Sequence, residues 1–353
     1  MKLKNFSRLL FLASVVMFLA ASCVKEGPMG PAGADGTNGT NGVDGDAGTV
    51  TCLDCHSGTK MDQKKAEFAM SEHSIGAVAV AYAGGRQDCA RCHSSQGFVE
   101  YATLGAVAGD ISNPSAWECA TCHGLHKTFE ATDYALRLGS APVASNIDAS
   151  YSFDFKNNSN LCVNCHQART AEPSKASAEG ATTFKITNTH YGPHHGPQGN
   201  VVAGVGFAEI PGTAAYPAPG SSKHFAAGAC TACHMADFTN KQGGHSLIPS
   251  VAACNKCHNA TDAGYDHGGV QTDVAAKLDQ LRDKLIELGV VTATPDATDP
   301  TIITYAPKVG TYPMVQAQAY YNWIGLEEDR SEGVHNPVYV RALLLNTLEA
   351  LNK

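Results

Sequence analysis

A five-residue pattern recurs six times along this 353-residue chain and constrains its fold more than any other feature. In each copy two residues separate a pair of cysteines, and a histidine follows the second cysteine directly. The copies lie at residues 52–56, 89–93, 119–123, 162–166, 230–234 and 254–258. C-x-x-C-H is the attachment signature of c-type haem. The sequence therefore predicts six covalently bound haem c groups.

Each residue type in the pattern has a chemical role. Two thiols three positions apart reach the two vinyl groups on one edge of a porphyrin, and the adjoining imidazole is held under the iron as the proximal ligand. The predicted thioether residues are Cys52, Cys55, Cys89, Cys92, Cys119, Cys122, Cys162, Cys165, Cys230, Cys233, Cys254 and Cys257. The predicted proximal ligands are His56, His93, His123, His166, His234 and His258.

Structural zinc is the competing interpretation, because paired C-x-x-C segments also build tetrahedral zinc sites. Zinc ligation does not require a histidine directly after the second cysteine, yet one follows in all six copies. Haem also suits the composition, with 35 glycines and only 16% charged residues. Six large apolar cofactors would help to form the core that such a loop-rich chain lacks.

The first 22 residues predict an export signal followed by a lipid attachment site. Lys4 and Arg8 flank the start of an apolar run that is shorter than the span of about 20 residues that a bilayer requires. The run ends in Leu-Ala-Ala-Ser-Cys, which resembles the bacterial lipobox, with Cys23 as the lipidated residue. An ordinary signal peptide with an incidental Cys23 is the alternative. The expected location is the bacterial cell envelope, at the outer membrane, on a face that the sequence leaves open.

Glycine occupies every third position from residue 27 to residue 48. This is the period of collagen, in which only glycine fits at the axis of three wound strands. Proline occurs in the repeat only at Pro28 and Pro31. We therefore expect residues 23–50 to form a lipid-anchored extended spacer, with homo-oligomerisation through the repeat as the alternative.

The remaining chain predicts two regions: a hexahaem domain at 51–268 and a helical region at 269–353. Apolar residues that recur at helical spacing predict the first C-terminal helix; they are Val274, Leu278, Leu281, Leu285 and Leu288. A second helix is expected over 314–326, and a third from Pro337, with Asn336 as its N-cap, to about Leu351. The predicted fold is mainly α with extensive loops, organised around a haem chain, with a C-terminal helical bundle.

The second axial position of each iron decides between electron transfer and catalysis, because an open position favours substrate binding. Nine histidines lie outside the motifs: His73, His126, His190, His194, His195, His224, His245, His267 and His335. Six of them would be enough to fill the second axial position of all six irons, so the sequence does not require any iron to have an open position.

Several short segments resemble the multihaem c-type cytochromes that include the ammonia-forming nitrite reductases and their octahaem relatives. The segments are Ser71-Glu72-His73, Cys122-His123-Gly124-Leu125-His126, His190-Tyr191-Gly192-Pro193-His194-His195-Gly196-Pro197, Gly243-Gly244-His245-Ser246 and Arg330-Ser331-Glu332-Gly333-Val334-His335-Asn336-Pro337. The resemblance spans roughly 51–353. It implies that histidines in such settings are distal ligands, often to a haem attached far away in the sequence.

On this resemblance the expected distal ligands are His73, His126, His224, His245, His335 and one member of the cluster at 190, 194 and 195. Within the cluster His190 is preferred and His194 comes next. His267 is expected to be a bystander. Methionine also serves as an axial ligand, which leaves Met61, Met70 and Met235 as alternatives.

One departure from the family separates the possible functions. Ammonia-forming nitrite reductases bind their catalytic haem through a motif that ends in lysine, and no C-x-x-C-K occurs here. The favoured function is therefore electron transfer to redox partner proteins or to an extracellular acceptor. The alternatives are a reductase of nitrogen or sulfur oxyanions, with Tyr191, His194, His195 or Lys223 as donors, and a protomer of a conducting filament. The net charge of −8 argues against nucleic acid as a partner.

Overall fold

The computed structural model describes residue 56 and residues 58–126, 134–258 and 264–353. The predicted leader, Cys23, the glycine-repeat spacer and the first cysteine pair, Cys52 and Cys55, lie outside these residues. Among the helices in the described part of the chain, none is long and apolar enough to cross a bilayer. The contacts of the chain place the whole of this part in one compact unit, Gly48–Lys353.

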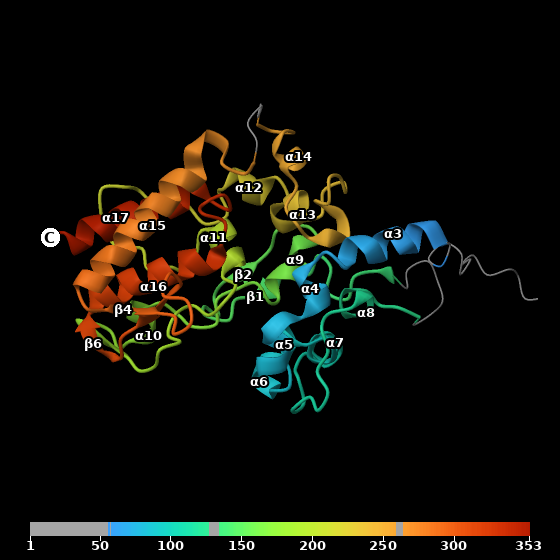
Figure 1. Cartoon of the computed structure of the whole chain (residues 1–353), viewed down its shortest axis with the longest axis horizontal. Coiled ribbons are helices and arrows are strands. Elements are labelled where there is room, and N and C mark those ends of the chain that lie inside the picture. Colours follow the sequence, from blue (N-terminus) through green and yellow to red (C-terminus); the bar gives the residue numbers. More distant parts are fainter. Residues whose placement is uncertain (1–55, 57, 127–133, 259–263) are drawn as a thin grey trace, which may run out of the picture. The chain divides into compact units, whose positions relative to one another are not determined.

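This part of the chain is mainly helical with long loops and small sheets, as the sequence predicts (Figure 1). The helices before residue 180 are α3 (Gly58–Phe68), α4 (Glu72–Ile75), α5 (Ala77–Ala83), α6 (Gln87–His93), α7 (Ser95–Leu104), α8 (Cys119–Cys122), α9 (Ser159–Val163) and α10 (Pro173–Ala176). The later ones are α11 (Gln198–Ala203), α12 (Lys223–Ala226), α13 (Ala229–His234), η2 (Gly244–Ser246), α14 (Val251–Cys254), η3 (His267–Gly269), α15 (Val270–Glu287), α16 (Met314–Asp329) and α17 (Pro337–Leu351).

The short helices α6, α8 and α13 each contain both cysteines of a pair, whereas α9 and α14 contain only the first cysteine and the second lies in the turn that follows. Residues three apart on a helix lie on the same side of it. One helical turn therefore presents both sulfurs of a pair in the same direction. All five described cysteine pairs thus lie at short helical turns.

The C-terminal helices α15, α16 and α17 pack on one another and form the main apolar core. The residues of α15 that the spacing pattern selects are buried, apart from Leu288, which is half-buried at the C-cap. The side chain of Asn336 accepts a hydrogen bond from the Tyr339 backbone N–H, and Pro337 begins α17. All three predicted helices are confirmed, with α16 extending three residues beyond its predicted end to Asp329.

Buried asparagines attach the loop before α12 to this bundle. Asn322 binds both backbone groups of Ala208, at 2.9 and 2.8 Å. Asn346 binds both backbone groups of Ala214, at 2.9 Å each. A side-chain amide can satisfy one donor and one acceptor at once, so each pair ties the loop to a helix without leaving a buried backbone group unpaired.

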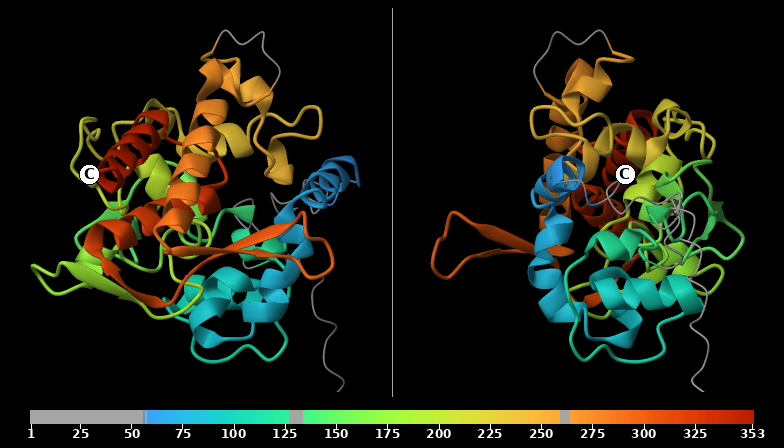
Figure 2. Two further views of the ribbon diagram at one scale, coloured as in Figure 1. Left: turned by 60° about the vertical axis from the view of Figure 1, so that its left-hand side comes forward. Right: turned by 90° about the vertical axis from the view of Figure 1, so that its right-hand side faces the viewer.

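Three two-stranded antiparallel sheets complete the described fold, and the sequence analysis predicts none of them. They pair β1 (Val143–Ala144) with β2 (Ser152–Phe153), β3 (Thr183–Ile186) with β6 (Gly310–Pro313), and β4 (Val291–Pro295) with β5 (Ile303–Pro307). The β3–β6 pair connects the middle of the chain to the start of α16. The β4–β5 hairpin, orange in Figure 2, projects away from the helices.

Candidate haem-binding cavity

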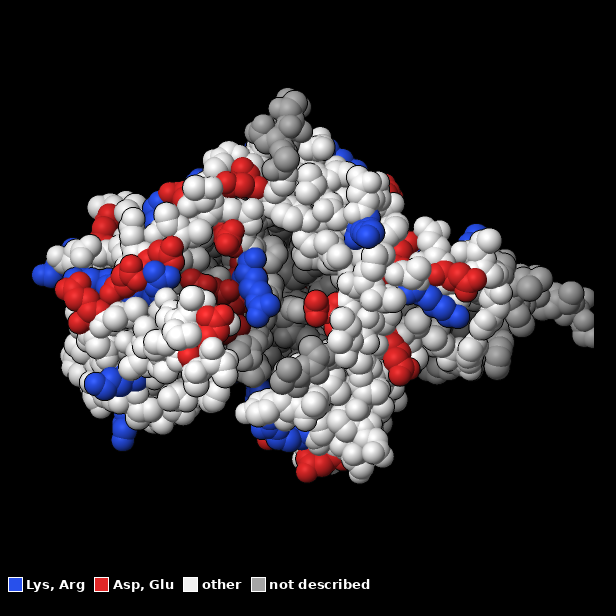
Figure 3. All heavy atoms as spheres, viewed as in Figure 1, with Lys and Arg blue, Asp and Glu red and all other residues white. Residues whose placement is uncertain are grey.

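A cavity of about 3450 Å³ lies among the short helices, and the surface is hollowed at the centre of the face shown in Figure 3. Pockets for one drug-sized ligand usually measure about 300–1,000 Å³. The cavity is therefore several times larger than a single small-molecule site. Its lining includes all ten described motif cysteines, all six motif histidines and eight of the nine other histidines.

Six pairs of histidine rings in the cavity each join one motif histidine to one histidine outside the motifs. The pairs and their ring-centroid distances are His56–His126 at 6.0 Å, His93–His194 at 6.0 Å, His123–His245 at 6.2 Å, His166–His73 at 6.0 Å, His234–His335 at 6.4 Å and His258–His224 at 6.2 Å. No motif histidine is left without such a counterpart. The spread of distances is narrow, although the two members of most pairs come from distant parts of the chain.

These distances fit an iron atom held between two imidazoles. A metal–imidazole bond of about 2 Å, with the ring centre about 1 Å beyond the nitrogen, places two trans imidazole centroids about 6 Å apart. In the described residues no group of three or more His, Cys, Asp or Glu side chains is arranged to hold a bare metal ion. Pairs are what haem requires from the protein, because the porphyrin supplies the other four ligands. The residues therefore fit haem.

Hydrogen bonds at Nδ1 fix the orientation of five of the paired rings. His224 contacts the carbonyl of Val334 at 2.6 Å, His234 that of Leu247 at 2.7 Å, and His123 that of Tyr134. Nδ1 of His166 lies 3.0 Å from Gln198 Oε1, and Nδ1 of His335 lies 2.7 Å from Asp329 Oδ1. A metal-bound histidine characteristically donates its second N–H to such an acceptor. The contacts leave Nε2 of each ring as the nitrogen for the metal.

Burial keeps several of these imidazoles in the neutral form, which is the form that binds metal. Burial, with repulsion from His166 and His234, lowers the pKa of His73 to about 4. Burial and the charge of Arg169 lower the pKa of His194 to about 4. For His335 burial acts in the same direction, but the charge of Asp329 and its hydrogen bond reverse the effect and raise the pKa.

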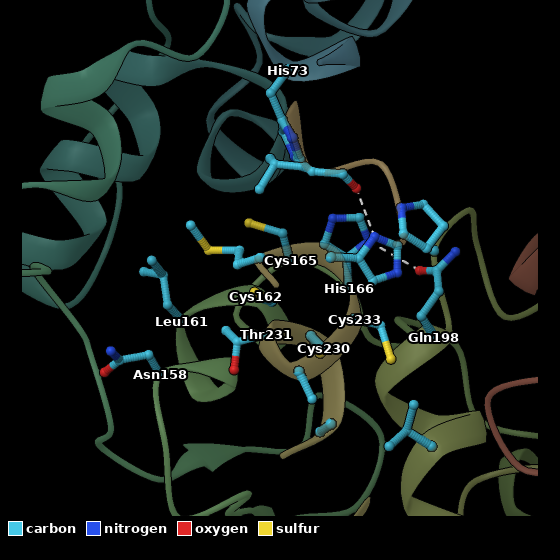
Figure 4. A pocket seen from close by; sticks show the side chains of 18 of the residues that line it. His73, Asn158, Leu161, Cys162, Cys165, His166, Gln198, Cys230, Thr231 and Cys233 are labelled. Atoms are coloured by element: carbon cyan, nitrogen blue, oxygen red, sulfur yellow. Dashed lines mark hydrogen bonds between the residues drawn. The ribbon is translucent and has the colours of Figure 1, made fainter. Parts of the chain in front are cut away.

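The centre of the cavity is shown in Figure 4. His73, from α4, points toward His166, which follows α9, and the sulfurs of Cys162 and Cys165 lie to one side of them. The dashed line that ends at Gln198 marks its hydrogen bond with His166, and Gln198 lies in the first turn of α11. Three helices from separate parts of the sequence thus contribute to one site.

Two of the ligand candidates lie in a strained backbone conformation. His126 has φ of 53° and His194 has φ of 75°. Residues other than glycine rarely adopt positive φ, and such strain concentrates at functional sites. In addition, His194 Nε2 is buried and makes no hydrogen bond to any described residue. A buried nitrogen of this kind is suited to a metal.

His190 does not join the cavity lining, and its side chain is exposed. The member of the cluster that faces a motif histidine is His194. His195 lines the cavity but binds Glu328 through Nδ1 at 2.6 Å. We therefore place His194, in preference to His190, in the proposed ligand set. The replacement of His190 by His194 is the one difference between the distal ligands predicted from the sequence and those proposed from the structure.

His267 lies with its ring centroid only 3.9 Å from that of His258. An iron atom cannot fit between rings this close, so His267 cannot be the trans ligand to His258. Met61, Met70 and Met235 line the cavity, but the six histidine pairs do not involve them. Tyr191, considered as a donor for catalysis, packs instead against Tyr320 and Tyr321 of the C-terminal core.

Neighbouring attachment sites touch one another through their cysteines. The Cys92 thiol contacts the carbonyl of Asn164 at 3.9 Å, and the Cys165 thiol contacts that of Arg91 at 3.7 Å. The side chains of Cys92 and Cys165 also interact directly, as do those of Cys162 and Cys230. The motif at 162–166 therefore adjoins two others, one at each of its cysteines.

No protein-family model matches the chain, and no curated protein matches it in sequence. A solved structure that it resembles is the outer cell wall cytochrome OcwA, with a TM-score of 0.49 and 18% sequence identity. The alignment covers 82% of this chain and 50% of that protein. The chain thus corresponds to about half the length of OcwA.

Proposed function

We propose that this chain is a hexahaem c-type cytochrome that transfers electrons at a bacterial cell envelope. The observation that carries the proposal is the set of six histidine pairs, each spanning 6.0 to 6.4 Å and each containing one motif histidine. Thioether attachment through the twelve motif cysteines accompanies these pairs. The proposed distal ligands are His73, His126, His194, His224, His245 and His335.

The chain's own residues would keep five of the twelve proposed iron ligands in place during a change of redox state. Haem iron with two histidine ligands supplies one-electron redox chemistry. Carbonyl groups, Gln198 and Asp329 hold the rings from behind through Nδ1. A ligand that is fixed in this way does not have to move, and a small rearrangement favours fast electron transfer.

The contacts between attachment sites support a route for electrons through the protein. Cys92 adjoins Cys165, and Cys162 adjoins Cys230. Cofactors anchored at neighbouring cysteines lie close to one another, as transfer between them requires. Among the ten described motif cysteines, Cys119 and Cys257 are exposed. Their attachment sites are the proposed points of contact with redox partners.

The pairing favours a carrier over a reductase of nitrogen or sulfur oxyanions. A reductase needs one iron with an open position, whereas each motif histidine here faces a second histidine. The pairing also weakens the filament alternative, because each pair forms within one chain and no ligand has to come from a neighbouring protomer. The lipid anchor at Cys23, the spacer and the outer-membrane location remain part of the proposal on the sequence of residues 1–50.

The intact mass and the spectrum of the purified holoprotein test this proposal. We expect the mass of the lipidated mature chain, starting at Cys23, plus six haems, together with a fully low-spin spectrum and no turnover of nitrite, hydroxylamine or tetrathionate above that of free haem. The double variant Cys162→Ser with Cys165→Ser should lose the mass of one haem. The matched control Cys23→Ser should lose the lipid and keep six haems. A colourless protein would refute the cofactor assignment, and a high-spin fraction with substrate turnover would favour the reductase.

A further inference from the structure

The carboxylate of Asp329 stands directly behind the ring of His335. Asp329 ends α16, and its side chain is only 1% exposed. Its Oδ1 accepts a hydrogen bond from His335 Nδ1 at 2.7 Å, and its Oδ2 accepts one from the Ser331 hydroxyl. Ser331 Oγ in turn accepts the backbone N–H of His335 at 3.3 Å. The charge is thus buried, oriented and held against a proposed iron ligand.

Four other proposed ligands contact neutral acceptors at the same ring position. His123, His224 and His234 face backbone carbonyls, and His166 faces the Gln198 amide oxygen. Glu67 lies near His245, but its Oε2 is 3.6 Å from His245 Nδ1. Lys64 Nζ also lies 2.9 Å from both oxygens of Glu67 and offsets their charge. Glu67 Oε2 accepts the backbone N–H of His245 at 3.0 Å, whereas Asp329 contacts the imidazole ring of its histidine directly.

A carboxylate behind an axial imidazole changes the electronic properties of the metal site. It attracts the Nδ1 proton, so the ring becomes more basic and donates more strongly to the metal. Stronger donation stabilises ferric iron, which carries one more positive charge than ferrous iron. The buried negative charge acts in the same direction, because a low-dielectric interior screens it weakly. Both effects lower the reduction potential of the group.

We propose that Asp329 is a redox-tuning residue that lowers the reduction potential of the haem held by Cys230, Cys233, His234 and His335. This inference rests on the proposed function. The tuned site has an internal position, since Cys230 adjoins Cys162 of the preceding motif and Cys233 lies near Cys254 of the next. Asp329 would therefore set the reduction potential of one haem in the interior of the electron-transfer route.

The test is a potentiometric titration of the holoprotein and of Asp329→Asn, followed optically and by electron paramagnetic resonance. Asparagine has nearly the same shape as aspartate but no charge. We expect one of six haems to shift to a more positive potential and one low-spin signal to change, with the other five unaffected. Asp296→Asn is the matched control, because Asp296 is an exposed carboxylate that directly follows β4 and does not line the cavity. It should leave all six potentials in place.

An Asp329→Asn protein with six low-spin haems and unchanged potentials would overturn the inference. If this variant instead loses the axial ligand, Ser331→Ala decides the question. Removing the Ser331 hydroxyl takes one hydrogen bond away from the Asp329 carboxylate. The carboxylate then presents more negative charge to the His335 ring. The same haem should then shift to a more negative potential, and an unchanged or raised potential would overturn the inference. A wild-type protein without six haems would instead contradict the proposed function.

Discussion

The rings of His73 and His166 face each other with their centroids 6.0 Å apart and their planes at 81°. His73 belongs to α4, whereas His166 follows α9, so the pair joins two distant segments of the chain. Both side chains line the same cavity, and burial lowers the pKa of each. In the proposed ligand set, the site at residues 162–166 would be completed by a residue from α4, a helix that contains no motif cysteine.

Replacing His73 with glycine should open one face of the iron at this site. We expect His73→Gly to convert one of six haems from low-spin to high-spin. Every other proposed distal ligand already faces a different motif histidine and cannot take the place of His73. Electron paramagnetic resonance of the oxidised protein measures the change. Added imidazole should enter the space left by the side chain and restore the low-spin signal. An unaltered low-spin spectrum would show that His73 is not a ligand.

The cluster at 190, 194 and 195 provides an internal comparison between neighbouring histidines. His194→Gly should produce one high-spin haem, because His194 faces His93 at 6.0 Å. His190→Gly should leave the spectrum unchanged, because the His190 side chain is exposed and lies outside the cavity lining. The opposite pattern would return the ligand role to His190.

Close packing at Gly199 holds the segment that carries His166. The Gly199 N–H donates to the His166 carbonyl at 2.9 Å. A Cβ at this position would lie 2.8 Å from the same oxygen and would also collide with Val163. Gly199→Ala should therefore cost about 1–3 kcal/mol of unfolding free energy and disturb the low-spin signal of this haem. In the control Gly109→Ala the added Cβ meets no described atom within 4 Å, so thermal unfolding should be unchanged.

The C-terminal bundle should stabilise the protein through its apolar core. Leu343 of α17 is fully buried, so Leu343→Ala should cost about 2–5 kcal/mol. Leu345 of the same helix is 40% exposed, and Leu345→Ala should change stability by no more than about 0.5 kcal/mol. Denaturant unfolding followed by far-ultraviolet circular dichroism compares the two. Equal losses would mean that the helix does not pack as described.

Local patterns in the sequence predict the proposed attachment sites, and they were sufficient to predict the C-terminal helices that the structure confirms. A cysteine pair and its histidine lie within five consecutive residues, and the apolar face of α15 follows a helical period. The strands were not predictable in this way. β3 is only four residues long and becomes a strand by pairing with β6, far along the chain. A contact of this kind leaves little trace in either segment alone.

Distal ligands depend on tertiary structure, and the histidine cluster illustrates why. His190 and His194 occur in one short loop of similar composition, and spacing does not show which ring enters the cavity. The positive φ of His194, which directs the local turn, is a property of the folded loop. The role of Asp329 was also not predictable from the sequence, because its contact with His335 forms only in the folded chain. Asp329 lies six residues before His335, and only the turn between α16 and α17 brings its carboxylate to the ring.

In the proposed assignment an iron atom lies between the two rings of each of the six histidine pairs. An anomalous difference map of the crystalline holoprotein, measured at the iron absorption edge, tests this most directly. We predict six peaks, each midway between the two rings of one pair, including His73 with His166 and His234 with His335. Fewer peaks, or iron bound to a motif histidine with a different residue or none on its other face, would contradict the account.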